Sequence, residues 1–418
     1  MPILPGFSSS VERWLLRQVF NTIGQPPIRV VLPDGVAISS TRAAPQATVL
    51  ISDYRTLLGL LLDPETGFGD AYAEGRIQVQ GNLLALLDAV YRSWPSTPGP
   101  TRYSRIASNW MAWWQANSPR GSRKNVHYHY DLSTDFYKLW LDRELVYTCA
   151  YFPSPTATLE QAQWSKMDYV CRKLQLQPGE TVVEAGCGWG ALALHMARHY
   201  GVSVKAFNLS HEQILFARRR AREEGLDHQV EFIEDDYRNI SGRFDAFVSV
   251  GMLEHVGTHN YSNLGRVIHR CLGNSGRGFL HFIGRTRTGR LSRWIRKRIF
   301  PGGHAPTLRE AIALLEPWNY ALLDVENLRL HYAKTLEHWL DRFEKASGQI
   351  AAIHDERFLR TWRLYLAGSL TAFQTGTLQL YQVLFAGPEC GRIQWTRAPL
   401  YAGEQPETQE RKWIHAMS

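Results

Sequence analysis

The hydrophobic and polar positions of the chain change their period part-way along the sequence. From residue 181 onward, short apolar runs alternate with longer amphipathic segments, which predicts a parallel sheet covered by helices on both faces. Strands are expected at residues 181–185, 202–207, 230–233, 244–250, 278–283, 321–327 and 378–385. Helices are expected at residues 191–199, 212–224, 264–271, 308–315, 334–347 and 356–373. The expected fold class is therefore α/β.

The residues before about 115 carry a separate pattern in which no catalytic spacing is found. A helix at 10–20 is expected to precede strands at 28–31 and 47–51, and helices at 54–62 and 82–91 follow. The proline-rich segment 94–100 is typical of a linker, and an aromatic-rich helix is expected at 103–116.

Composition narrows the possible classes of protein. Of the 418 residues 44% are hydrophobic and 21% charged, which excludes a disordered tail, a collagen-like fibre and a disulfide-stapled miniprotein. The five cysteines form no CxxC pair, so we expect a reduced chain without a structural zinc or another metal. No apolar run reaches the roughly 18 residues of a membrane helix. The N-terminal residues lack a signal-peptide cleavage site, so a cytoplasmic protein is expected.

Basic residues outnumber acidic residues by 47 to 39, which favours an anionic partner such as nucleic acid, an acidic metabolite or a bacterial inner membrane. The excess is concentrated between Arg285 and Arg298, where basic and apolar residues interleave and no acid occurs. At helical spacing this segment would present an apolar face bordered by cations, a design that favours a lipid surface. A merely solvated basic helix is the alternative.

A glycine-rich turn lies between the strand at 181–185 and the helix at 191–199, and it contains Gly186, Cys187, Gly188 and Gly190. Such a turn lets the backbone approach a ligand, and the N-terminus of the helix offers unpaired N–H donors. Dinucleotide-binding enzymes use a similar turn. Here, however, the second strand runs into Asn208–Ser210, with no acid to bind a ribose hydroxyl.

S-adenosylmethionine suits these residues better than a dinucleotide does. It carries a zwitterionic amino acid and a sulfonium in place of a pyrophosphate, and Glu184 at the end of the strand could hold its ammonium group. Asp236 and Tyr237 follow the third strand, where an acid could accept from the adenine amino group and a ring could stack on the base. Another nucleotide, or a turn that serves packing alone, is the alternative.

Several segments resemble the cyclopropane-fatty-acyl-phospholipid synthases and their mycolic-acid relatives. They are His129–Tyr137, Tyr147–Phe152, Val183–Gly190, Ser249–Gly257, His281–Gly284, Ile299–Gly302 and His331–Leu336. Together these ordered motifs cover roughly residues 120–390. The segment Gly67–Gly75 resembles the lipid-associated domain of the longer members that act on phospholipids.

The resemblance implies a class I S-adenosylmethionine-dependent methyltransferase with a Rossmann-like seven-stranded sheet, a helical lid and a smaller α+β N-terminal domain. We expect a lipid-binding or dimerisation domain at 1–100, a linker helix at 101–120, the catalytic domain at 121–395 and a C-terminal tail at 396–418. The implied reaction transfers a methyl group to the cis double bond of a phospholipid acyl chain, and bound bicarbonate then deprotonates the carbocation to close a cyclopropane ring. A methyl-branched or methylenated product is the alternative within the family, and a nucleic-acid methyltransferase is the alternative outside it.

The resemblance also implies roles for individual residues. Around the cofactor these are Tyr147, Thr148, Asn208, Leu209, Ser210, Gln213, Asp236 and Tyr237. Around bicarbonate they are Cys149, Glu254, His281, the backbone of Ile283, and Tyr332. Independently of the resemblance, Glu254 and His281 come at the ends of the fourth and fifth strands, the edge where open α/β sheets bind ligands. The acyl chain would need an apolar tunnel, to which Tyr151, Phe152, Trp318 and Trp362 are expected to contribute.

The expected partner is a phospholipid bilayer with unsaturated acyl chains, with anionic lipids favoured and no nucleic acid. The chain is expected to form a homodimer and to associate peripherally with the inner face of the membrane.

His127, His129 and Asp131 alternate, so on a strand they would share a face and could bind a metal. The start of a helix at this point, capped by Asp131 or Ser133, is the preferred interpretation.

Overall fold

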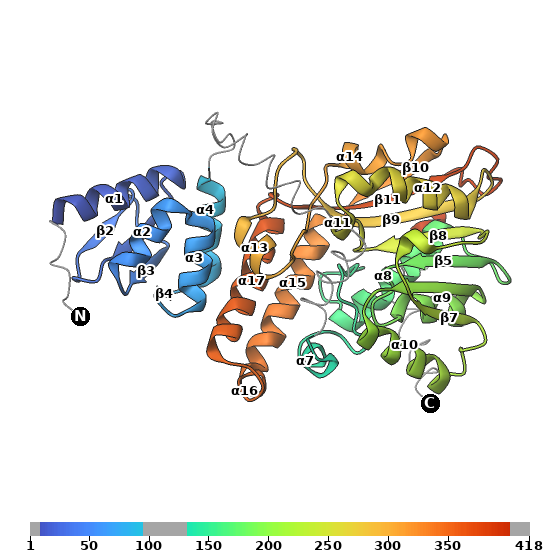
Figure 1. The fold of residues 1–418 in the computed structure, drawn as a ribbon, viewed down its shortest axis with the longest axis horizontal. Coiled ribbons are helices and arrows are strands. Elements are labelled where there is room, and N and C mark those ends of the chain that lie inside the picture. Colours follow the sequence, from blue (N-terminus) through green and yellow to red (C-terminus); the bar gives the residue numbers. More distant parts are fainter. Residues whose placement is uncertain (1–8, 95–131, 402–418) are drawn as a thin grey trace. The chain divides into compact units, whose positions relative to one another are not determined.

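The computed structural model describes residues 9–94 and 132–401, whose contacts divide them into two units, each with its own sheet (Figure 1). The first unit takes its described residues from Met1–Ala116, Thr288–Gly303 and Tyr332–Leu378. The second takes its described residues from Asn117–Arg287, His304–His331 and Gln379–Ser418. The domain boundaries expected from the sequence at 100, 120 and 395 stay predictions, and the expected linker helix lies outside the described residues.

The second unit is built on a seven-stranded sheet in the order β10-β11-β9-β8-β5-β6-β7. The strands are β5 (Thr181–Ala185), β6 (Ser203–Asn208), β7 (Val230–Glu234), β8 (Ala246–Val250), β9 (Arg277–Gly284), β10 (Ala321–Asn327) and β11 (Gln379–Ala386). Strands β5 to β9 are parallel, whereas β11 runs antiparallel to both β9 and β10. This arrangement confirms the predicted α/β class.

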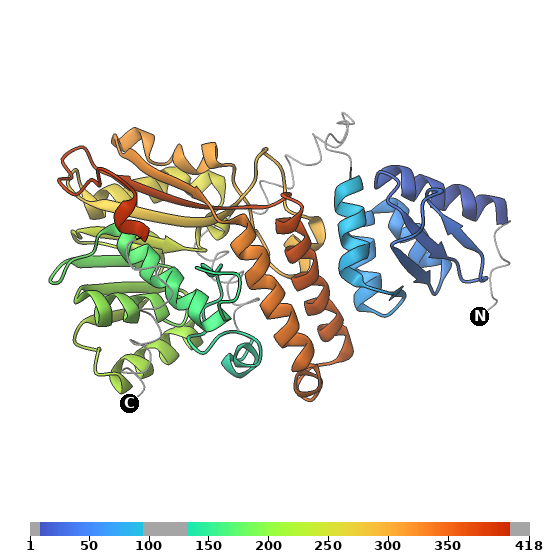
Figure 2. The same ribbon diagram turned by 180° about the vertical axis from the view of Figure 1, so that it is seen from behind.

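Helices cover both faces of this sheet because its buried strands carry apolar side chains on each side (Figures 1 and 2). On one face Val182 packs with helices α8 to α10, and on the other Val183 packs with α11, α12 and α14. The helices are α7 (Thr134–Lys138), α8 (Leu159–Leu174), α9 (Ala191–Tyr200), α10 (His211–Glu223), α11 (Leu253–Val256), α12 (Tyr261–Leu272), α14 (Leu308–Ile312) and α18 (Ala398–Tyr401). Short 3-10 turns occur at η1 (Tyr237–Asn239), η2 (Thr258–Asn260) and η3 (Glu316–Trp318).

The first unit contains a four-stranded sheet in the order β2-β1-β3-β4, in which β1 and β3 are parallel. Its N-terminal elements are α1 (Ser9–Thr22), β1 (Ile28–Val31), β2 (Ala37–Ser39), β3 (Ala47–Ile51), α2 (Tyr54–Leu62), α3 (Pro64–Ala73), β4 (Ile77–Gln80) and α4 (Leu83–Ser93). Later segments of the chain add α13 (Arg293–Arg298), most of α15 (Arg329–Lys345), α16 (Ser347–Ala351) and α17 (Glu356–Gln374).

Helix α3 joins these distant segments inside the first unit. Gly69 leaves room for the indole of Trp294, which lies on the surface of α3 at the position that a Cβ would occupy. Asp70 accepts two hydrogen bonds from Arg298, at 2.9 and 2.8 Å. On α17 the Arg360 guanidinium lies 4.3 Å from the ring centre of Tyr72 and donates to the carbonyl of the same residue. The segment Gly67–Gly75 therefore contains the residues that bind α13 and α17 to the N-terminal helices.

Part of the basic segment from Arg285 to Arg298 packs within the first unit. Its helix, α13, is only six residues long, and the apolar side chains of Trp294 and Ile299 are buried, at 4% and 1% exposure. Arg293 donates to Asp63 at 2.9 Å across the same contact. Two of its apolar side chains therefore pack within the first unit, whereas Leu291 and Ile295 are only half-buried, and the expected role of the segment at a lipid surface stays a prediction. Among the described residues no helix is long and apolar enough to cross a membrane.

We predict that Gly69→Ala destabilises the protein, because the added methyl group would overlap the Trp294 indole. Overpacking of this kind costs about 1–3 kcal/mol in the free energy of unfolding. Chemical denaturation monitored by tryptophan fluorescence measures this loss.

Gly59→Ala is the matched control, since Gly59 lies in α2 and, apart from its own neighbours in the helix, no atom lies within 4 Å of the position of its Cβ. There the same substitution should leave the free energy of unfolding unchanged or raise it by up to about 1 kcal/mol. Equal effects of the two substitutions would contradict a close contact between Gly69 and Trp294.

Candidate active site

The glycine-rich turn between β5 and α9 is held tightly against the neighbouring strands. The N–H groups of Gly186 and Cys187 both donate to the carbonyl of Phe207 on β6, at 2.9 and 3.1 Å. Gly190 has a φ of 87°, and a Cβ there would lie 2.6 Å from the Phe232 ring and 2.9 Å from Ala217. Glycine at this position therefore lets the turn lie directly on the sheet, with the N-terminus of α9 behind it.

Helix α7 supports this turn through an aromatic cluster. The indole of Trp189 donates to Thr134 Oγ1 at 3.3 Å, and its ring meets Tyr137 edge-on with 4.9 Å between the ring centres. Tyr147 contacts the rings of Tyr137 and Trp140, each at 5.3 Å. The part of the His129–Tyr137 motif that the structure describes thus braces the turn, whereas His127, His129 and Asp131 lie outside the described residues.

Glu184 is the second-last residue of β5, just before the turn, and is 2% exposed. Its Oε2 atom is buried and has no hydrogen-bond partner among the described residues. Burial raises the pKa of this carboxyl to about 8, and only the charge of Lys166 acts in the opposite direction. The carboxyl is therefore mostly protonated at neutral pH, and a cationic group bound beside Oε2 would favour its ionised form.

The residues after β6 form the second wall of the candidate site. Asn208 donates to the carbonyl of Gly188 at 3.3 Å and to Gln213 Oε1 at 2.7 Å, while its Oδ1 accepts from the N–H of Leu209. Ser210 caps α10 by accepting from the Gln213 N–H at 3.4 Å. These bonds link the glycine turn to the start of α10.

The residues after β7 form the third wall. The Asp236 carboxylate binds Arg238 through its two oxygens, at 2.8 and 3.0 Å, and also accepts from the Arg238 backbone N–H. The hydroxyl of Tyr237 is buried without a partner among the described residues, and burial raises its pKa to about 12. The Tyr237 hydroxyl thus lacks a partner in the described residues, while the Arg238 guanidinium lies 5.3 Å from the centre of its ring. The roles of Asp236 and Tyr237 toward adenine stay predictions.

Helix α8 fixes the segment that contains Tyr147, Thr148 and Cys149. Gln163 donates to the carbonyls of Val146 and Thr148, at 3.2 and 2.9 Å, and Lys166 donates to Thr148 Oγ1 at 3.0 Å. The Thr148 methyl group in turn packs against Gly251, 2.9 Å from the position of a Cβ there. Because the Gly251 N–H donates to the carbonyl of His281, this contact brings the 147–149 segment to the ends of β8 and β9.

Glu254 and the backbone of Ile283 are in direct contact. Glu254 lies on α11 after β8, and its Oε1 accepts from the Ile283 N–H at 2.6 Å. Its other oxygen, Oε2, is buried and has no partner among the described residues. Burial raises the pKa of this carboxyl to about 7, although the hydrogen bond from Ile283 acts in the opposite direction.

His281 is held by Gln382, which lies directly opposite on the antiparallel strand β11. The amide nitrogen of Gln382 lies 3.2 Å from Nδ1 of the imidazole. Burial and the charges of Lys166 and Lys173 hold the pKa of His281 well below its usual value, so the ring is neutral. A neutral ring that accepts at Nδ1 carries its proton on Nε2, an atom that is buried without a partner among the described residues.

Cys149 and Tyr332 are the other two residues of the predicted bicarbonate set. Cys149 is fully buried, and its thiol donates to the carbonyl of Ala150 at 3.1 Å. Tyr332 belongs to the first unit, where its ring meets Phe373 at 4.5 Å and Trp339 at 6.0 Å. The joint action of Cys149, Glu254, His281, Ile283 and Tyr332 on one ion stays a prediction.

Sequence reasoning missed four polar residues beside these groups. They are Gln163, Lys166, Tyr261 and Gln382, all less than 9% exposed. Only Gln382 had a signal in the sequence, as a polar residue inside an otherwise apolar strand. The others lie on helices, where a polar residue by itself indicates nothing about a site.

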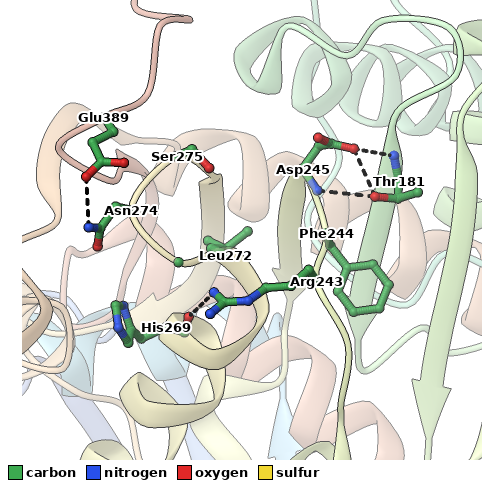
Figure 3. Close-up of a pocket in the computed structure, with 10 residues that line it drawn as sticks. Thr181, Arg243, Phe244, Asp245, His269, Leu272, Asn274, Ser275 and Glu389 are labelled. Carbon is green, nitrogen blue, oxygen red and sulfur yellow. Dashed lines mark hydrogen bonds between the residues drawn. The ribbon is translucent and has the colours of Figure 1, made fainter.

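A separate hollow of about 590 Å³ lies at the opposite, amino edge of the sheet (Figure 3). Its lining includes Thr181 at the start of β5 and Asp245 just before β8, which bind each other at 2.8 and 2.9 Å. Trp318 stacks on His269, another lining residue. The expected place of Trp318 in an acyl tunnel is therefore wrong, because its ring packs near the edge away from the glycine turn.

Comparison with known proteins identifies the fold and its chemistry. The family model described as "Mycolic acid cyclopropane synthetase" matches residues 117–383. The chain belongs to this family. A "Probable fatty acid methyltransferase" of Pseudomonas putida is 36% identical over 90% of this chain and 96% of its own. The "Cyclopropane-fatty-acyl-phospholipid synthase" of Escherichia coli is 41% identical over 62% of this chain and 66% of its own.

Solved structures agree with this assignment. The cyclopropane synthase MmaA2 from Mycobacterium tuberculosis matches with a TM-score of 0.61 and 30% identity, over 63% of this chain and 98% of its own. The mycolic acid cyclopropane synthase CmaA1, complexed with SAH and CTAB, matches with a TM-score of 0.60 and 31% identity. The match covers 63% of this chain and 97% of the CmaA1 chain. The chain is therefore a class I S-adenosylmethionine-dependent methyltransferase of the cyclopropane synthetase family.

The residues of this methyltransferase fit its cofactor. Glu184 Oε2 and the Tyr237 hydroxyl are buried polar atoms without protein partners in the described part of the chain. Glu184 comes two residues before the glycine turn, in which a side chain at position 190 would overlap Phe232. Such atoms are rarely left unpaired in folded proteins unless water or a ligand satisfies them.

We predict that Gln382→Met lowers the turnover of this methyltransferase while its affinity for S-adenosylhomocysteine stays unchanged. Methionine keeps the volume of the side chain but removes the donor that holds the proton of His281 on Nε2. Loss of a group that orients another functional group typically costs about 10- to 100-fold in activity. Steady-state kcat and a calorimetric titration with S-adenosylhomocysteine separate the two quantities.

Gln379→Met provides the control on the same strand, because the Gln379 amide oxygen accepts from Asn327 instead. This variant should keep most of its kcat. A similar fall in kcat for both variants would show that β11 tolerates no methionine, and would remove the case for a specific role of Gln382.

Proposed function

We propose that this methyltransferase acts on membrane phospholipids and converts the cis double bond of an unsaturated acyl chain into a cyclopropane ring, with bicarbonate as the base. The observation that carries the proposal is a pair of buried polar atoms, Glu254 Oε2 and His281 Nε2, which lie after β8 and near the end of β9 and have no partner in the part of the chain that the structure describes. Both are atoms of residues expected to bind a small oxyanion. The ring-forming chemistry needs a base at this place.

The cofactor supplies an electrophilic methyl group on a sulfonium. Bicarbonate would supply a weak base that is not itself easily alkylated. Of the chain's own groups, neutral His281 presents an N–H donor, and Glu254 presents an acceptor when its carboxyl is ionised. The contact between Glu254 and the Ile283 N–H fixes the direction of that carboxyl. Cys149 and Tyr332 would complete the set.

The pattern of similarity supports a second product. Two relatives that match 90% and 91% of this chain are named as methyltransferases of fatty acids. They are the "Probable fatty acid methyltransferase" of Pseudomonas putida and the "Tuberculostearic acid methyltransferase UfaA1" of Mycobacterium tuberculosis, which is 32% identical over 91% of its own length. A methyl-branched or methylenated chain is therefore the alternative. It would use the same residues, because it also needs loss of a proton from the methylated chain.

The partner and the location follow from the proposed substrate. An enzyme that modifies acyl chains in a bilayer must work at the membrane surface, and we propose a peripheral protein of the cytoplasmic face. A homodimer and a preference for anionic lipids belong to the same proposal. The cations of α13 give little support to that preference, since Arg293 and Arg298 bind Asp63 and Asp70.

Lipid mass spectrometry tests the proposed product. Expression in a bacterium that makes monounsaturated phospholipids and lacks its own cyclopropane synthase should yield phospholipid chains heavier by one methylene. These chains should resist mild hydrogenation, whereas a methylene branch takes up hydrogen. Purified enzyme should modify intact phospholipid vesicles and leave free fatty acids unmodified.

The control is expression of the Glu254→Gln variant in the same host, which gives the lipid profile expected without enzyme activity. An unchanged lipid profile with the folded wild-type enzyme present would refute the proposed substrate. Chains that are heavier by one methylene and take up two hydrogens on mild hydrogenation would favour the methylenated alternative.

We predict that activity falls as pH drops below about 7 when the concentration of bicarbonate ion is held constant. The pKa of Glu254 is raised to about 7, so protonation below that pH removes its acceptor. The acidic limb of kcat/KM reports this ionisation of the free enzyme. The pH profile of kcat/KM with and without added bicarbonate is the measurement.

Glu254→Gln should abolish this limb together with most of the activity, and Glu231→Gln, a surface change beside Lys205, should leave it in place. Full activity in carefully decarbonated buffer would exclude bicarbonate as the base.

A further inference from the structure

Lys166 is a buried cation that the proposed roles leave without a function. It lies in the middle of α8, its side chain is completely enclosed, and the whole residue is 2% exposed. Within residues 9–94 and 132–401 its single hydrogen bond is donated to Thr148 Oγ1, at 3.0 Å. An ammonium group has three donors, so two of them have no partner in this part of the chain. Burying such a group is unfavourable unless an anion pairs with it.

The groups that act on Lys166 are those of the cofactor site. Burial lowers its pKa to about 8, and the acidic groups of Asp142, Cys149 and Glu184 oppose that shift. Asp142 already accepts from the N–H groups of Val146 and Glu144, both at 2.9 Å. The Asp142 carboxylate is therefore hydrogen-bonded to backbone N–H groups and not to Lys166. The remaining donors of Lys166 are left for a ligand.

Glu184 is the counterpart of Lys166 on the sheet. Each group is buried and each influences the charge of the other, yet neither forms a hydrogen bond to the other. Lys166 has unused N–H donors, and Glu184 has the unused acceptor Oε2. A ligand that carries an anion and a cation on neighbouring atoms would satisfy both.

We propose that Lys166 binds the carboxylate of the methionyl group of S-adenosylmethionine while Glu184 binds its ammonium group. The amino-acid end of the cofactor is a zwitterion with its two charges on one carbon, which matches the pair of unused groups. Thr148 positions Lys166 through its hydroxyl, and Gln163, one turn earlier on α8, holds the carbonyl of the same threonine. The inference rests on the proposed placement of the cofactor beside Glu184.

A second buried lysine on the same helix shows what a purely structural lysine looks like here. The Lys173 side chain is likewise fully enclosed, but its ammonium binds Asp324 at 3.0 Å and Glu326 at 2.6 Å. Its charge is therefore satisfied by β10. Of these two lysines only Lys166 has donors to spare.

The test compares S-adenosylmethionine with its decarboxylated form, which keeps the sulfonium and the amine but lacks the carboxylate. Calorimetric binding to the full-length protein, without lipid, gives a dissociation constant for each. Wild-type protein should prefer S-adenosylmethionine by roughly 10- to 100-fold, the usual contribution of a hydrogen-bonded charge pair. In Lys166→Met that preference should fall to within about 3-fold, mainly through weaker binding of S-adenosylmethionine.

Lys173→Met is the matched control, an identical substitution of an equally buried lysine on the same helix. It should lower the melting temperature and keep the wild-type preference. Lys166→Gln serves if Lys166→Met does not fold, because glutamine keeps a donor without the charge. The preference of the wild-type protein needs no variant at all.

Three results would overturn the inference. They are no preference in the wild-type protein, an equal loss of affinity for both ligands in the Lys166 variants, and a loss that occurs only when bicarbonate is present. The last would assign Lys166 to the bicarbonate ion instead. Failure of the wild-type protein to bind either ligand would count against the cofactor site itself, and is thus distinct from these.

Discussion

The candidate site depends on one constraint, which is that several polar atoms are buried at the carboxyl edge of the seven-stranded sheet without protein partners. Glu184 Oε2, Glu254 Oε2 and His281 Nε2 are all of this kind among the described residues. Each such atom destabilises the fold by about 1–3 kcal/mol unless something satisfies it. The parallel strands impose the location, because their carboxyl ends meet at one edge and β8 and β9 bring Glu254 and His281 to it.

Hydrogen bonds within the protein fix the orientation of the groups around these atoms. Glu254 is held by the Ile283 N–H, His281 by Gln382, Thr148 by Lys166, and the glycine turn by Phe207 and Trp189. Glu254 and His281 thus each have one atom fixed by the protein and another without a partner among the described residues. Groups oriented in advance need no reorganisation when charge develops, and this is the usual source of electrostatic catalysis.

The first unit uses its own notable residues for assembly. The glycines of α3 admit Trp294 and the close approach of α2, and Asp70 and Tyr72 bind arginines from α13 and α17. Segments 288–303 and 332–378 therefore fold with the N-terminal residues even though they follow the glycine turn in sequence. A motif that resembles a lipid-associated domain has, in this structure, a clear packing role.

The sequence by itself determined the α/β class, the strands of the large sheet, the glycine turn with Glu184, and the placement of Glu254 and His281. Period, glycine spacing and strand ends are local signals, and local signals can be read without knowing what packs on them. The sequence did not predict helices α8 and α3 or the packing of Trp294 on α3. Only the tertiary structure decided that Lys166 faces Thr148 while Lys173, seven residues later on the same helix, faces β10, and that Gln382 lies opposite His281. The physical reason is that the role of a buried polar side chain is set by its partners, and these come from strands and helices far away in the chain.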